Sequence, residues 1–95
     1  MHKITNISIL EAFKICCIFN NGEKKVLDLF KVLDDSNKYK SKVLNDAVFH
    51  LAKIGSFGEI YWDNIGEIKN YDGSILTCEY DISPEFAYFN STKIN

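Results

Sequence analysis

The sequence predicts an α+β domain with a mostly antiparallel sheet of about five to six strands and two or three short helices. Three observations support this class. Apolar and polar residues alternate along several short segments, as in strands with one buried face. The pairs Asn21-Gly22 and Asp72-Gly73 separate such segments, where hairpin turns are typical. A few stretches instead carry helix caps or helical spacing, and the 95 residues suit one domain spanning 1–95.

The first third of the chain predicts three strands. Residues 4–10 alternate at Ile7 and Ile9. Residues 24–29 read as the return strand of a hairpin that turns at Asn21-Gly22. Residues 13–19 form the other strand of that hairpin and share one apolar face made by Phe13, Ile15, Cys17 and Phe19.

Two short helices are expected next, separated by a polar loop over 34–41. Residues 29–33 carry one helical stripe and predict a single turn. Asn45 can cap a second helix, because its side chain can accept hydrogen bonds from the free N–H groups of the first turn. We expect Leu44 and Val48 to face inward there, with Leu51 close to them.

The second half predicts a meander followed by a helix. Residues 59–63 read as a strand that continues past a bulge near Gly66, and residues 75–82 alternate cleanly. Ile60 and Trp62 are the inward positions of the first strand. The apolar face of the second strand is formed by Leu76, Cys78, Tyr80 and Ile82. Ser83-Pro84 then starts a helix in which Phe86 and Phe89 close the core, and the tail from Asn90 is expected to fray.

The charged residues argue against phosphate and guanine recognition, and the absence of targeting signals argues against a membrane or secreted protein. All 11 basic residues are Lys, so the chain lacks the bidentate guanidinium that recognises phosphate and guanine. The net charge of −2 divides into +3 over residues 1–45 and −5 over residues 46–95. We expect strand pairing to mix the two halves. No apolar run is long enough to span a membrane and no signal peptide is evident, so a cytoplasmic location is expected.

Cysteines and histidines give no sign of a catalytic or metal site. Cys16 and Cys17 are adjacent on a strand, so their side chains point to opposite faces and do not match zinc-ligand spacing. Cys17 and Cys78 are expected to pack as small apolar residues. His2 is placed in a mobile start, and His50 is interpreted as a surface residue or a partly satisfied structural histidine.

Charged stretches and loops also have ordinary structural explanations. Glu59, Asp63, Glu67 and the pair Asp34-Asp35 are expected at solvated strand edges and loop tips. The turn at 55–58 lacks the Lys-Ser/Thr that follows a phosphate-binding loop. The basic run Lys38-Tyr39-Lys40-Ser41-Lys42 offers phosphate contacts, but the chain is acidic overall and nucleic-acid binding is not expected. We therefore predict no catalytic, cofactor-binding or metal-binding residue, no cofactor, and no enzyme activity.

A series of short motifs resembles a known family over nearly the whole chain. The motifs are Phe19-Asn20-Asn21-Gly22-Glu23, Val26-Leu27-Asp28-Leu29, Leu44-Asn45-Asp46 with Phe49, Gly58-Glu59-Ile60-Tyr61-Trp62, and Asp81-Ile82-Ser83-Pro84-Glu85-Phe86-Ala87-Tyr88. In this order they resemble the small bacterial proteins grouped as domain-of-unknown-function family 2442. The chain departs from the family pattern by an added strand-turn-strand at 64–80.

The resemblance implies a compact α+β domain without a recognised active site. Some relatives are encoded beside another small protein, an arrangement like that of toxin–antitoxin pairs. Two functions follow as hypotheses. The first is a non-enzymatic protein-interaction module, expected as a homodimer that associates through a sheet edge or a hydrophobic face. The second is a regulatory or antitoxin-like subunit that binds a small partner protein encoded nearby.

Overall fold

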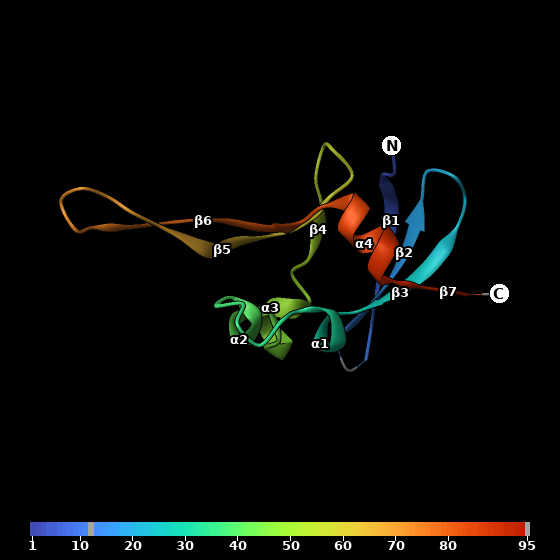
Figure 1. Cartoon of the computed structure of the whole chain (residues 1–95), viewed down its shortest axis with the longest axis horizontal. Coiled ribbons are helices and arrows are strands. Elements are labelled where there is room, and N and C mark those ends of the chain that lie inside the picture. The colour runs from blue at the N-terminus through green and yellow to red at the C-terminus, as the bar shows by residue number, and fades with distance from the viewer. Residues whose placement is uncertain (12, 95) are drawn as a thin grey trace.

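The computed structural model describes residues 1–11 and 13–94, which form two antiparallel sheets and four short helices (Figure 1). The α+β class predicted from the sequence is confirmed. In chain order the elements are β1 (Ile4–Leu10), β2 (Lys14–Phe19), β3 (Lys24–Asp28), α1 (Leu29–Val32), α2 (Lys40–Val43), α3 (Asp46–Phe49), β4 (Lys53–Ile54), β5 (Ile60–Lys69), β6 (Ile75–Ile82), α4 (Pro84–Asn90) and β7 (Thr92–Lys93).

The first sheet has the strand order β1-β2-β3-β7. The predicted hairpin joins β2 to β3, and Gly22 adopts a positive φ of 86° in its turn, a conformation that glycine reaches without a Cβ clash. Phe13 was predicted as the first residue of β2. It lies in the turn before the strand instead, with a φ of 63°, and its ring packs edge-on against Phe49.

The C-terminal segment is more ordered than the sequence predicted. The tail from Asn90 was expected to fray, but α4 continues to Asn90 and β7 then pairs with Lys25 and Val26 of β3. A hydrogen bond from the Ile94 amide to the Lys24 carbonyl extends this pairing. The end of the chain therefore closes one edge of the first sheet.

The second sheet has the order β4-β5-β6 and is dominated by the long β5–β6 hairpin. The predicted bulge is present: Trp62 pairs with Tyr80 and Gly66 with Cys78, so β5 has two more residues than β6 between these pairs. Asn64 lies within the bulge at a φ of 59°. The Asp72-Gly73 turn joins the two strands, with Gly73 at a φ of 89°.

The hydrophobic core lies where the two sheets and the short helices meet. Trp62 is fully buried, and its indole N–H donates to the Phe49 carbonyl. The full set of buried residues is Ile4, Ile15, Cys17, Phe19, Leu27, Leu29, Leu33, Val43, Phe49, Ile60, Trp62, Ile65, Ile82 and Ala87. Among the described residues, no helix is long and apolar enough to cross a membrane.

Three inward positions predicted from helical spacing were wrong. Leu51 is exposed and Phe49 is buried in its place. In α4, Phe89 is 72% exposed and Phe86 is 40% exposed, whereas Ala87 is completely buried. The small Ala87 side chain lets the helix approach the first sheet closely, so α4 presents a face rotated from the expected one.

The two halves of the chain remain largely separate in the sheets. Strands β1, β2 and β3 pair with one another, and β4, β5 and β6 form the second sheet, so the expectation that strand pairing mixes the halves was wrong. Only β7 joins the first sheet from the second half. Outside the sheets the halves do meet, since α4 packs on the first sheet and Lys42 pairs with Glu67 of β5.

Candidate interaction surface

The outer part of the β5–β6 hairpin, residues 63–80, projects from the rest of the molecule and is called the arm below (Figure 1). The remaining described residues form the body. The arm accounts for the elongated dimensions of 51 × 26 × 21 Å. Residues 64–80, which the sequence predicted to form a strand-turn-strand, make up almost all of it. Among the described residues, strand pairing in its outer part joins only β5 to β6.

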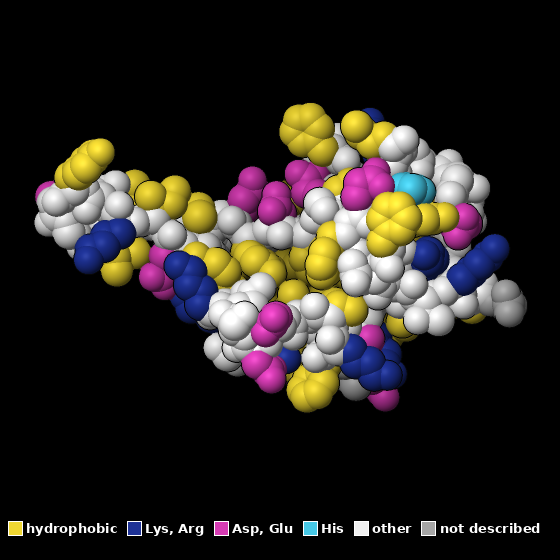
Figure 2. Space-filling view, in the orientation of Figure 1, with side chains coloured by type: hydrophobic (Ala, Val, Ile, Leu, Met, Phe, Trp, Pro, Cys, Tyr) yellow, Lys and Arg dark blue, Asp and Glu magenta, His cyan; other side chains and the backbone are white. Residues whose placement is uncertain are grey.

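One face of the arm is apolar and continues the core outward. From the body toward the tip, the cross-strand pairs on this face are Trp62 with Tyr80, Gly66 with Cys78, and Ile68 with Leu76. Exposure increases along this series: Trp62 is buried, whereas Ile68 is 54% and Leu76 55% exposed. Figure 2 shows hydrophobic side chains exposed along the arm and at its far end. We call this face the apolar stripe.

The opposite face of the arm is mostly acidic, although Lys69 and the 60% exposed Ile75 pair at its outer end. Lys53 of β4 pairs with Asp63 at 2.9 Å, and Lys42 of α2 pairs with Glu67 at 2.6 Å. The hydrogen bond from Lys42 lowers the pKa of the Glu67 carboxyl below its ordinary value. Further along β6, Thr77, Glu79 and Asp81 are exposed. The arm is therefore amphipathic.

The tip of the arm is a defined turn that presents an aromatic ring. The Asn70 amide donates to the Ser74 carbonyl and the Gly73 amide to the Asn70 carbonyl. The Asp72 carboxylate accepts from both the amide and the hydroxyl of Ser74, which lowers the pKa of this carboxyl. Tyr71 is fully exposed at this turn.

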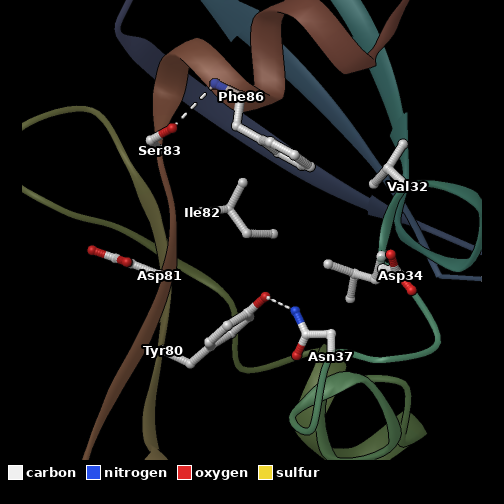
Figure 3. Close-up of a pocket in the computed structure, with 9 residues that line it drawn as sticks. Val32, Asp34, Asn37, Tyr80, Asp81, Ile82, Ser83 and Phe86 are labelled. Carbon is white, nitrogen blue, oxygen red and sulfur yellow. Dashed lines mark hydrogen bonds between the residues drawn. The ribbon is translucent and has the colours of Figure 1, made fainter.

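A hollow of about 420 Å³ lies where the arm joins the body (Figure 3). Its lining comes from three segments, the end of β6, the start of α4, and the loop after α1, and is formed by Val32, Leu33, Asp34, Asn37, Tyr80, Asp81, Ile82, Ser83 and Phe86. Because Tyr80 and Ile82 belong to the same face of β6 as Leu76 and Cys78, this groove lies at the inner end of the apolar stripe.

Polar groups fix the walls of this groove. The Asn37 side-chain amide donates to the Tyr80 hydroxyl at 3.1 Å, bridging the loop and β6 (Figure 3). The Tyr80 ring also lies 5.3 Å from that of Tyr39. At the rim, Asp34 accepts a hydrogen bond from the Ser36 amide, which lowers the pKa of the Asp34 carboxyl. In Figure 3 the side chain of Asp81 points away from the groove.

The three cysteines occupy different environments. Cys17 is buried in the first sheet, and burial raises the pKa of its thiol to about 12, so the reactive thiolate form is scarce. Cys16 is half-buried on the opposite face. Cys78 packs over Gly66 on the apolar stripe, so close that a Cβ at Gly66 would lie 2.6 Å from the Cys78 sulfur. The packing role predicted for Cys17 is confirmed, whereas Cys78 is only half-buried and lies outside the core.

The two histidines have different surroundings. His50 is exposed, as predicted, with Nδ1 2.7 Å from the Asp46 carbonyl oxygen. The prediction of a mobile start around His2 was wrong. The His2 ring stacks on Tyr88 with 3.6 Å between ring centroids, and its Nδ1 lies 2.7 Å from the Glu85 carboxylate. These contacts hold the start of the chain against α4.

The carboxylates and the basic run considered in the sequence analysis lie at separate places on the surface. Glu59 accepts from the Phe57 amide in the 55–58 turn, whereas Asp63 and Glu67 pair with lysines. Asp35 pairs with Lys40 at 2.7 Å and is almost fully exposed. Within the basic run 38–42, Lys40 and Lys42 are thus engaged by carboxylates. In the described part of the chain, no group of three or more metal-binding side chains comes together.

The sequence patterns predicted a strand-turn-strand at 64–80 but not that it projects from the body as the arm. Alternation in 75–82 showed which residues share a face, but not that the outer half of that face lacks cover. The available signal was the length of the hairpin predicted at 64–80, for which no covering segment was predicted. Comparisons with protein-family models, with curated proteins and with solved structures found no match.

Proposed function

We propose that this chain is a non-enzymatic protein-interaction module that self-associates as a homodimer through the apolar stripe of its arm. The observation that carries the proposal is the exposed cross-strand pair Ile68 and Leu76 at the outer end of the stripe. Large apolar residues that adjoin on a projecting surface are typical of protein-binding sites.

The arm's structure adds an energetic argument. A two-stranded hairpin on its own is marginally stable in water, and three or more strands or a packed face are usually needed. Near the body, the stripe is covered by Tyr39, whose ring packs against Tyr80. Burial of Ile68 and Leu76 against a partner would supply the missing cover, at roughly 25 cal/mol for each Å² of apolar surface removed from water.

Sedimentation across a concentration series tests this proposal with a matched pair of variants. Leu76→Asp places a charge on the apolar stripe, whereas Thr77→Asp places the same charge on the opposite face of the same strand. We expect the wild-type chain and Thr77→Asp to dimerise, and Leu76→Asp to remain monomeric. A wild-type chain that stays a monomer at high micromolar concentration would contradict the proposal.

Co-expression with the protein encoded next to this chain addresses the antitoxin-like hypothesis. If that neighbour copurifies with the wild-type chain and with Thr77→Asp but not with Leu76→Asp, the arm serves a different partner and self-association through it is wrong. If the neighbour fails to copurify while the homodimer forms, the antitoxin-like hypothesis is wrong.

A further inference from the structure

We propose that residues 34–42, called the strap below, open and close over the inner end of the apolar stripe and so set how much of the stripe a partner can reach. This inference rests on the proposed function and adds its regulation. In the closed arrangement that the structure shows, the strap covers Tyr80, and the exposed part of the stripe is the outer pair Ile68 and Leu76.

The strap is anchored in the core at its ends but not along its length. Leu33, directly before it, and Val43, directly after it, are buried. Residues 34–42, all of which the structure describes, include no buried side chain. Segments with few buried contacts open at a lower free energy than the core does. The strap can therefore leave the arm while Leu33 and Val43 stay in place.

Polar and aromatic contacts hold the middle of the strap to the arm. The Asn37 amide donates to the Tyr80 hydroxyl at 3.1 Å, and the rings of Tyr39 and Tyr80 lie 5.3 Å apart. The Tyr39 hydroxyl accepts from the Glu67 backbone amide at 3.4 Å. The Lys42 ammonium lies 2.6 Å from the Glu67 carboxylate, and these side chains are 45% and 42% exposed. Exposed ion pairs are weak because water and salt screen them, so this attachment is easily broken.

The strap has little other support. It ends in α2, a four-residue helix whose N-cap makes no side-chain hydrogen bond, and a helix this short is not stable on its own in water. On the side away from the arm, the groove of about 420 Å³ separates Asn37 of the strap from Phe86 of α4 (Figure 3). The strap is therefore packed mainly on the arm itself.

Bonds within the strap let it move as a unit. The Asn37 amide donates to the Asp34 carbonyl at 2.8 Å, and the Tyr39 amide donates to the Asn37 side chain at 2.9 Å. Lys40 pairs with Asp35 at 2.7 Å. Because both partners of each bond belong to the strap, these bonds persist when it leaves the arm.

Opening would lengthen the apolar surface that a partner can contact. Tyr80 lies on the same face of β6 as Leu76 and Cys78, so removal of Asn37 and Tyr39 would extend the accessible stripe inward to the Tyr80 ring. Tyrosine is enriched at protein interfaces. A partner that uses Tyr80 binds the open arrangement more tightly and shifts the strap toward it, and an open strap strengthens binding by the same factor.

Hydrogen exchange with two matched variants tests what holds the strap. Glu67→Gln removes the charge that pairs with Lys42 of the strap, whereas Asp63→Asn removes the charge that pairs with Lys53 of β4. The Lys42 and Val43 amides both donate to the Tyr39 carbonyl and report opening. At a concentration where the chain is monomeric, these amides should exchange about two- to fivefold faster in Glu67→Gln and at the wild-type rate in Asp63→Asn. Equal rates in the two variants would overturn the proposal.

A charge swap checks that the pair itself holds the strap. Lys42→Glu places a carboxylate beside Glu67 and should speed exchange of the Val43 amide further than Glu67→Gln does. Adding Glu67→Lys restores an opposite pair and should return exchange toward the wild-type rate. A double variant that exchanges as fast as Lys42→Glu alone would show that Lys42 acts in some other way.

Sedimentation of the same matched variants tests whether the strap limits binding. Both variants lose one negative charge from the same face of the arm, so differences between them report on the strap. Glu67→Gln should dimerise about two- to fivefold more tightly than Asp63→Asn, because a larger fraction of the chain has the full stripe accessible. A purely structural role predicts the opposite sign, since loosening a packed segment would weaken the dimer. Equal or weaker dimerisation of Glu67→Gln would overturn the regulation.

The two proposals fail in different ways. If the wild-type chain and both variants sediment as monomers, the proposed function is wrong and the strap has no self-association to regulate. If dimers form with the same dissociation constant in Glu67→Gln and Asp63→Asn, self-association stands and only the strap's control of it is wrong.

Discussion

The β2–β3 hairpin of the body and the β5–β6 hairpin of the arm have similar local structure. They differ in how much of each is covered by other parts of the chain. Each has alternating strands, and each turns at a glycine with positive φ, Gly22 or Gly73. The body hairpin is flanked by β1 and β7 and buries Ile15, Cys17 and Leu27. The outer arm has neither flanking strands nor a covering layer in the described part of the chain.

The comparison distinguishes two properties of a strand: that it has an apolar face, and what covers that face. Alternation specifies that a segment is a strand with an apolar face, because a period of two directs every second side chain to the same side. It does not specify what covers that face. In the body, cover comes from the chain itself, and in the arm we propose that it comes from a second copy.

The largest expected change in the free energy of unfolding comes from truncating a core residue of the body, and truncating a residue of the apolar stripe serves as the comparison. Phe49→Ala removes a buried ring that packs on Phe13 and Trp62, so the free energy of unfolding should fall by about 3–5 kcal/mol. Leu76→Ala, measured at a concentration where the chain is monomeric, should change it by only about 0.5 kcal/mol. Urea denaturation followed by circular dichroism gives both values. A comparable loss in the two variants would show that the arm is covered within one copy.

A smaller effect tests whether the arm has its own tight packing. Gly66→Ala would place a Cβ 2.6 Å from the Cys78 sulfur and should destabilise the arm by about 1–3 kcal/mol. Hydrogen exchange should report faster exchange at arm amides and unchanged exchange in the first sheet. Adding Cys78→Ala removes the clashing sulfur and should restore much of the protection. Failure of this rescue would point to the nearby Glu79 carbonyl, 3.1 Å from the same position, as the obstacle.

The junction between arm and body can be weakened at a single cap. Ser83 accepts a hydrogen bond from the Phe86 amide at 3.1 Å and starts α4 directly after β6. Ser83→Ala should lower the free energy of unfolding by about 1 kcal/mol. Thermal denaturation measures the change, and Ser56→Ala in the exposed 55–58 turn is the control, with little expected effect. A larger loss in Ser56→Ala would contradict the role of the cap.

The smallest effect is the acid sensitivity of the body at the start of the chain. Hydrogen bonds from His2 lower the pKa of Glu85 in the folded state. Its stabilising contribution is therefore complete above the unfolded pKa of about 4.3 and is lost as pH falls through the lower folded value. Glu85→Gln should flatten the decrease of melting temperature below about pH 5, whereas Glu79→Gln on the arm should not. Identical acid profiles for wild type and Glu85→Gln would contradict this contribution.

Strands and caps could be predicted because their signals are local. Asn45 accepts from the Ala47 amide and Ser83 from the Phe86 amide, and both caps are visible in the sequence as side chains next to helix starts. Helix α2 was not predicted. Its N-cap, Tyr39, provides no capping hydrogen bond. The Tyr39 ring instead packs against Tyr80, and its hydroxyl accepts from the Glu67 amide, both far along the chain.

Long-range contacts explain the other errors. His2 is held largely by α4, which follows more than 80 residues later and brings Tyr88 and Glu85 to it. The phase of α4 is set by the space beside Phe19, whose ring lies 5.0 Å from that of Tyr88. The groove was missed for the same reason, since the segments lining it meet only after the sheets have assembled.

The position of Trp62 has a practical consequence for spectroscopy. It is the only tryptophan in the chain and it is buried where the arm leaves the body, with its N–H bonded to a backbone carbonyl. Its fluorescence should therefore be blue-shifted in the folded chain and should move to longer wavelength only when the body opens. Since Tyr71 at the distant tip contributes no indole signal, this single native fluorophore separates unfolding of the body from movement of the arm without any label.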